Sequence, residues 1–137
     1  MSASVFLGGG RITGALLSGL RLAGYDAPAI VHDRHVSKMR ALQCNFGAAP
    51  ETDLQRAIAQ ASILILAVRP DTVREVLDAV GQVDRRMVAV SLAAGVPLAR
   101  LRRRLGPPVR WARAMPARST ACRRTLLILP CWRRRSG

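Results

Sequence analysis

The sequence predicts an α/β fold: a doubly wound, mainly parallel sheet with helices on both faces. Short apolar segments alternate with stretches of helical periodicity, as they do in repeated strand–helix units. Residues 62–68 (Ser-Ile-Leu-Ile-Leu-Ala-Val) form a continuous apolar run that is typical of a parallel strand covered on both faces. The chain has 137 residues, of which half are hydrophobic, so its length and composition fit one globular domain.

The first strand–helix unit is the clearest. Residues 3–7 are a short apolar run ended by glycines, which predicts a buried strand. Apolar residues then recur at three- and four-residue spacing over 12–23, the stripe of a helix packed on one face, and Gly24 suits its end. The same pattern predicts further elements before residue 62: a strand over 29–32, a helix over 36–46 that ends at Gly47, and a helix over 51–61.

The second half continues the alternation. Asp71 is expected to cap a helix that runs to Val80. Residues 87–92 are the next expected strand, and Pro97 is expected to open a helix as a first-turn proline. Residues 109–114 are expected to form the last strand. Residues 1–116 are therefore expected to form the domain, with residues 117–137 as a basic tail without periodicity that we expect to be disordered.

Charge is distributed unevenly along the chain. The net charge is +14, yet residues 1–84 hold all eight acidic residues and eight basic ones, whereas residues 85–137 hold fourteen arginines and no acid. The three cysteines are too few and too scattered for a disulfide framework or a metal site. The N-terminus lacks the basic region of a secretory signal, and no apolar run has the ~20 residues that cross a bilayer. We expect a soluble protein of the reducing cytoplasm that has no membrane partner.

A glycine turn, Gly8-Gly9-Gly10, follows the first strand and opens the first helix. In this context, a G-x-G pattern predicts a dinucleotide site. The first glycine permits a tight turn, Gly10 lets the backbone approach a pyrophosphate, and the amides of the first helical turn point at that anion. Thr13 stands where the motif usually has a small residue. The alternative is a glycine-rich turn that holds no ligand.

Two residues at the end of the second expected strand bear on the choice of cofactor. A carboxylate such as Asp33 favours NAD, because it accepts hydrogen bonds from the ribose hydroxyls. A guanidinium such as Arg34 can pair with the 2′-phosphate of NADP. The cofactor is therefore expected to be NADP or NAD, and the sequence leaves the choice open. His35 could assist in binding phosphate, but we expect it to be a solvated loop histidine, and His32 is expected to bind nothing.

Several segments together resemble one enzyme family, pyrroline-5-carboxylate reductase, which catalyses the last step of proline synthesis. The matching segments, in order, are Val5–Gly10 leading to Ala15-Leu16, Val31–Arg34, Leu66–Pro70, Val90–Val96 and Arg113–Pro116. The first motif is shared by many dehydrogenases, but the A-V-R-P, A-A-G-V and R-A-M-P segments in series are more specific. The resemblance covers residues 3–116.

This resemblance implies a Rossmann-like domain that binds NAD(P)H, which passes a hydride to the C=N carbon of 1-pyrroline-5-carboxylate. It also implies the cofactor contacts. The pyrophosphate would be bordered by Gly8, Gly10, Arg11, Ile12 and Thr13, and the adenosine ribose by Asp33 and Arg34. The nicotinamide side would be bordered by Ala67, Val68, Arg69 and Pro70, and its pocket by Ala93, Ala94, Gly95 and Met115. No catalytic residue and no metal ligand is implied within this chain.

The resemblance ends at Pro116. Members of the family continue into a second, helical domain that supplies the dimer interface and most of the imino-acid site. The chain is therefore expected to be a truncated or frameshifted reductase that retains the cofactor-binding half. A small imino-acid substrate would need a second domain, so we expect no appreciable turnover by this chain alone.

Two other functions stay open. One is a stand-alone dinucleotide-binding module without catalysis. The other is a basic protein that adheres to nucleic acid through Arg102–Arg104, Arg133–Arg135 and Trp132. Consecutive helical residues point in different directions, so Arg102–Arg104 do not form one patch by themselves. We therefore expect weak, nonspecific adhesion and no specific nucleic-acid partner.

Overall fold

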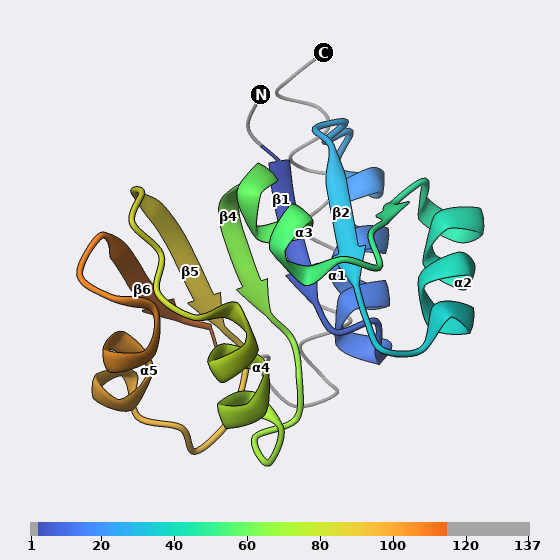
Figure 1. Cartoon of the computed structure of the whole chain (residues 1–137). Helices are drawn as coiled ribbons and strands as arrows, with labels where there is room; N and C mark the ends of the chain where they lie inside the picture. Colours follow the sequence, from blue (N-terminus) through green and yellow to red (C-terminus); the bar gives the residue numbers. More distant parts are fainter. Residues whose placement is uncertain (1–2, 115–137) are drawn as a thin grey trace.

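Six parallel strands form the sheet of the computed structural model, which describes residues 3–114. The strands are β1 (Ala3–Leu7), β2 (Ala29–His32), β3 (Ala49–Pro50), β4 (Ala61–Leu66), β5 (Met87–Ser91) and β6 (Val109–Arg113). The helices are α1 (Arg11–Leu22), α2 (Val36–Phe46), α3 (Leu54–Gln60), α4 (Val73–Val80) and α5 (Leu98–Leu105). The strand order is β3-β2-β1-β4-β5-β6, and every neighbouring pair is parallel. The predicted doubly wound fold is confirmed, and Figure 1 shows it.

The strand order follows from the direction in which the chain moves. From β1 the chain steps outward to β2 and β3, and from β4 it steps outward in the opposite direction to β5 and β6 (Figure 1). Since parallel crossovers are right-handed, a change of direction moves the connecting helices to the other face of the sheet. The order therefore reverses between β1 and β4, where open α/β sheets bind their ligands.

Each face of the sheet has its own core. On one face, α3, α4 and α5 pack over the strands from β2 to β6. Their buried residues form one cluster with those of the strands, which includes Val5, Leu64, Leu77 and Leu101. On the other face, the smaller cluster that includes Phe6, Leu17 and Val31 lies between α1, α2 and the strands β1 and β2. The latter face is open over β4 and β5, where Ile63 is 37% exposed and Val88 is 42% exposed.

Most expected elements are present with small changes of length. The predicted bounds of β1, β2 and α2 are confirmed, and α2 ends as expected at Gly47, whose φ of +69° suits glycine. The expected strands at 62–68, 87–92 and 109–114 are shifted or shortened by one or two residues. Such differences at element ends are small.

Three expectations were wrong, those for the helix over 51–61, for Asp71 and for Pro97, and one strand was not expected. The helix predicted over 51–61 is only α3, because Asp53 caps it by accepting hydrogen bonds from the backbone amides of Gln55 and Arg56. The two-residue strand β3 was not expected.

Asp71 does not cap α4. Thr72 occupies the N-cap position, and the Asp71 carboxylate lies 3.7 Å from Arg69 Nε instead. Pro97 is the N-cap of α5 and precedes its first turn, rather than lying within it.

Candidate functional site

The loops after β1, β2, β4 and β5 meet at the carboxyl edge of the sheet, toward which the arrows labelled β1, β2, β4 and β5 point in Figure 1. Backbone hydrogen bonds continue past the strand ends and tie these loops together. The Ala67 amide donates to Leu7 O (2.9 Å), and the Leu92 amide donates to Leu66 O (3.0 Å). The glycine turn therefore lies at the point where the strand order reverses.

Gly8 is required by the geometry of the turn. Its φ is +107°, a conformation that side chains disfavour, and a Cβ added there would lie 2.5 Å from the carbonyl oxygen of Ala67. The Gly8 amide donates to His32 O at 2.9 Å. Any larger residue would therefore push apart the loops after β1 and β4, so the expected tight turn is confirmed.

Gly10 opens the first helix toward solvent. It is the N-cap of α1, no side chain caps the helix, and no acidic residue lies in its first turn. A Cβ added to Gly10 would meet no atom within 4 Å. The open side of the turn, called the cradle below, thus offers helix amides to an anion. Arg11 and Ile12 are exposed beside it.

Thr13 points into the protein. It is fully buried, and its hydroxyl donates to the carbonyl oxygen of Gly8 at 2.5 Å. The hydroxyl is therefore satisfied without a ligand, and only the backbone of Thr13 is placed to border one. This bond also explains how a polar residue occupies the position where the motif usually has a small one.

Asp33 braces the glycine turn. Its Oδ2 accepts a hydrogen bond from the Gly9 amide (2.7 Å), and its Oδ1 accepts one from the His35 amide (2.8 Å). The side chain is only 13% exposed. Burial alone would raise the pKa of this carboxyl, but the two backbone amides, the His35 ring and the charge of Lys38 outweigh it and hold the pKa below its usual value. Asp33 is therefore a carboxylate that the protein itself binds.

Basic side chains follow Asp33 along the chain, and each has a different neighbour. The Arg34 side chain is 67% exposed, and its Nη1 lies 3.3 Å from Oε1 of Glu75 on α4. The His35 ring nitrogen Nδ1 lies 3.1 Å from Asp33 Oδ1. Lys38 lies on α2 against the glycine turn, since a Cβ on Gly9 would come within 3.2 Å of Lys38 Cβ. Gly9, Lys38 and Glu75 were not among the residues expected at the site.

The remaining expected contacts lie along the loops after β4 and β5. Ala67 and Val68 are half-buried, whereas Arg69 and Pro70 are exposed. Ala93 is buried in the larger core, so only its backbone faces the edge, while Ala94 and Gly95 are exposed. Met115 and residues 117–137 lie outside the described residues.

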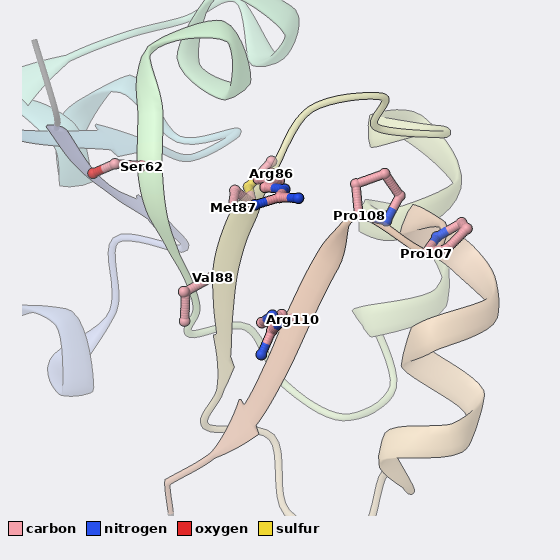
Figure 2. A pocket seen from close by; sticks show the side chains of 7 residues that line it. All are labelled: Ser62, Arg86, Met87, Val88, Pro107, Pro108 and Arg110. Atoms are coloured by element: carbon pink, nitrogen blue, oxygen red, sulfur yellow. The ribbon is translucent and has the colours of Figure 1, made fainter.

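A separate hollow of about 620 Å³ lies at the opposite end of the strands. It is lined by residues at the starts of β4, β5 and β6 and in the turn before β6, namely Ser62, Arg86, Met87, Val88, Pro107, Pro108 and Arg110 (Figure 2). Because ligands of open α/β sheets bind beyond the carboxyl ends of the strands, this hollow is not the expected dinucleotide site.

The arginine cluster of α5 is divided among different surroundings. Arg104 forms an ion pair with Asp78 of α4, while Arg102 and Arg103 are exposed.

His32 Nδ1 lies 2.9 Å from the carbonyl oxygen of Glu51. Among residues 3–114, no group of three His, Cys, Asp or Glu side chains is arranged to hold a metal ion. Within the same residues, no helix has the length and apolar character to span a membrane.

Comparison with known proteins agrees with this arrangement. The family model described as "NADP oxidoreductase coenzyme F420-dependent" matches residues 4–95. The pyrroline-5-carboxylate reductase of Pasteurella multocida is 34% identical over 116 residues, which cover 81% of this chain and 42% of that protein. That of Methanosarcina acetivorans is 32% identical over 114 residues, again 81% of this chain and 42% of the relative.

A solved structure shows the same similarity. The pyrroline-5-carboxylate reductase of Coxiella burnetii superposes with a TM-score of 0.78 at 28% identity, over 84% of this chain and 44% of that one. The resemblance noted in the sequence is confirmed, and the chain spans about two fifths of the length of the relatives that it matches.

Proposed function

The chain belongs to the family described as NADP oxidoreductase coenzyme F420-dependent, and from this premise we propose that it binds a nicotinamide dinucleotide, NADP or NAD, on the glycine turn. The cradle at Gly10 carries the proposal: the N-terminus of α1 lacks a side-chain cap and an acidic first turn, and it has open space where a Cβ would be. Hydride transfer is the chemistry that this cofactor supplies when bound.

The proposed roles within the site are those that the resemblance to the reductase family implies. The backbone of Gly8, Gly10, Arg11, Ile12 and Thr13 would border the pyrophosphate, and Asp33 and Arg34 the adenosine ribose. Ala67–Pro70, Ala93–Gly95 and Met115 would border the nicotinamide. The main contribution of this chain is to hold the cofactor in one orientation, which is the entropic part of catalysis.

The reaction of the relatives gives the wider proposal. We propose that the chain is the cofactor-binding half of a pyrroline-5-carboxylate reductase of the reducing cytoplasm, acting in proline synthesis. A stand-alone dinucleotide-binding module is the second candidate, because the described residues form a sheet with two buried cores and a complete glycine turn. Both functions require the same cofactor site.

Titration of the purified chain with NADH and NADPH, followed by calorimetry, tests cofactor binding. Gly10→Val is expected to weaken the binding of NADH and of NADPH by about 10-fold or more, because the valine side chain fills the cradle without meeting protein atoms. Ala15→Val, on the exposed side of the same helix, is the matched control and should bind like the parent. The proposal fails if Gly10→Val binds both nucleotides as tightly as the parent.

Reduction of 1-pyrroline-5-carboxylate, measured as NADPH oxidation, separates the two candidates. The chain alone is expected to show no appreciable turnover, because it matches only 42% of the length of the Pasteurella multocida reductase and the resemblance assigns most of the imino-acid site to the unmatched part. Restored turnover after addition of the separately expressed remainder of the Pasteurella multocida reductase would favour the reductase half. Binding without restored turnover would favour the module.

A further inference from the structure

The strands β4, β5 and β6 share an uncovered patch on the sheet face that carries α1 and α2. Residues paired in a parallel sheet point to the same face, and the pairs here are Ile63 with Val88, Val88 with Arg110, and Val90 with Ala112. Of these residues, Val90 is half-buried and the other four are exposed. We call the five residues the open patch. Figure 2 shows Val88 and Arg110 on the adjacent strands β5 and β6.

The apolar part of the open patch is contiguous. Ile63 and Val88 are paired on neighbouring strands, and Met87, Pro107 and Pro108 line the hollow of about 620 Å³ that adjoins them. Contiguous apolar surface with a polar rim is typical of a site where another polypeptide docks. The neighbouring part of this face is covered by the helices α1 and α2. A helix also fits the open patch, because side chains at i, i+3, i+4 and i+7 form an apolar stripe that can lie along the strands.

Charge at the hollow restricts what can dock beside it. Among residues 3–114, Arg86 and Arg110 both line the hollow, no acidic side chain lines it, and neither arginine forms an ion pair. Figure 2 shows both side chains at the hollow. Two cations without a partner oppose the docking of a basic segment and favour one that carries carboxylates.

Two occupants made of this same polypeptide bring the wrong charge. Residues 115–137 include the apolar run Leu126–Leu129, yet they hold six arginines and no acidic residue. A second copy packed face to face would bring its own Arg86 and Arg110 to the patch. Both arrangements place like charges together across an interface, which costs free energy.

We propose that the open patch is a docking surface for an amphipathic helix of another protein. The apolar stripe of that helix covers Ile63 and Val88, and carboxylates on its flank pair with Arg86 and Arg110. The hollow lies at the amino ends of the strands, opposite the glycine turn, so this inference goes beyond dinucleotide binding and does not depend on it.

The probe is a synthetic helical peptide of about 14 residues, with leucines along one stripe and glutamates on its flanks. Its Kd for the full-length chain is measured by fluorescence anisotropy at ~50 mM salt, beside the same peptide with lysine in place of each glutamate. The acidic peptide is expected to bind about 10-fold or more tightly than the basic one, and to weaken as salt is added. Equal binding of the two peptides, or no saturable binding of either, would overturn the inference.

Matched variants locate the bound peptide, because acidic peptides also adhere to a chain of net charge +14. Arg110→Glu should weaken the acidic peptide about 10-fold, whereas Arg103→Glu, exposed on α5 at the other face, should weaken it less than about 2-fold. Val88→Thr should weaken it about 5-fold, because the stripe then covers a hydroxyl. Val36→Thr, at an exposed valine of α2, should leave the Kd unchanged. Equal effects within either pair would contradict docking at the open patch.

Two further measurements test the other occupants. Sedimentation of the parent should show no dimer that Val88→Thr dissociates, and Leu127→Ser should leave the Kd of the acidic peptide unchanged. A dimer lost in Val88→Thr would assign the open patch to a second copy. Tighter peptide binding by Leu127→Ser would assign it to residues 126–129. Either result would replace the proposed partner.

Discussion

Two regions of the same sheet face differ in how they are covered. Over β1 and β2, α1 and α2 bury Phe6 and Val31 completely. Over β4 and β5, the same face leaves Ile63 and Val88 exposed, and Figure 2 shows Val88 at the edge of the hollow near Arg110. Val31 and Val88 are both strand valines with neighbours on either side, so their strands alone do not explain the difference.

The difference arises from the path of the chain. Crossovers from β1 to β3 put α1 and α2 on one face, whereas the crossovers from β3 through β6 put α3, α4 and α5 on the other. Over β4, only Ile65 on this face packs against the smaller core cluster, and Ile63 and Val88 stay exposed. Coverage therefore depends on where distant segments cross the sheet and not on the apolar character of the strand.

The largest expected effect is on the free energy of unfolding of two matched variants. Val31→Ala should cost about 2 kcal/mol, because it removes two buried methyl groups and leaves a cavity. Val88→Ala should cost about 0.5 kcal/mol, since its side chain is already partly in water. Urea denaturation with an unchanged m-value measures both. Equal costs would show that the face over β5 is covered in solution and would break the comparison.

The sequence predicted the parts of the fold that local pattern encodes. The glycines after residue 7, the helical stripe of α1 and the strand at β2 are contiguous signals, and their elements are present as predicted. The continuous apolar run at β4 predicted burial on both faces, yet Ile63 is exposed, because covering it requires a helix from elsewhere in the chain. The strand β3 has only two residues and leaves no periodicity to detect.

The meeting of the loops at one edge of the sheet was also predicted from local patterns. Gly8, Asp33 and Arg34 stand next to strand ends, so their place at one edge follows from the parallel topology. The bond from Gly9 to Asp33 joins residues 24 apart, and the pair of Arg34 with Glu75 joins residues 41 apart. Such partners depend on how the loops come together in three dimensions, so a single sequence does not reveal them.

Two buried polar groups, one beside β1 and one on β6, give predictions of intermediate size for the free energy of unfolding. Thr13, beside β1, donates its hydroxyl to Gly8 O, so Thr13→Val should cost about 1 kcal/mol by leaving that carbonyl without its partner. Trp111 on β6 is buried, and its Nε1 has no hydrogen-bond partner among residues 3–114. Trp111→Phe should therefore cost less than Thr13→Val, because it removes a buried donor along with some apolar contact. Thermal unfolding of the two variants at one pH checks the order, and the reverse order would contradict it.

Because Asp33 holds the glycine turn as a carboxylate, the free energy of unfolding is expected to depend on pH. The folded-state pKa of this carboxyl is below its usual value, so ionised Asp33 stabilises the fold above about pH 4, and this contribution is lost as the pH falls through the folded value. Asp33→Asn should therefore be less stable than the parent at pH 7, with a gap that narrows toward pH 3. Urea midpoints at both pH values measure the gap. A gap independent of pH would show that the carboxylate charge is not what stabilises the turn.

The smallest expected effect on stability comes from polar substitution on the open face. Val88→Lys leaves an ammonium at a position that water already reaches, so its cost should stay within about 0.5 kcal/mol. Val88→Lys should also reduce the fluorescence of a dye that binds exposed apolar surface, because Ile63 and Val88 belong to that surface. Arg74→Lys, on exposed α4, is the control and should leave the dye signal unchanged. Strong destabilisation by Val88→Lys would mean that another part of the polypeptide packs over β5, and the two regions of the sheet would then differ only in which segment covers them.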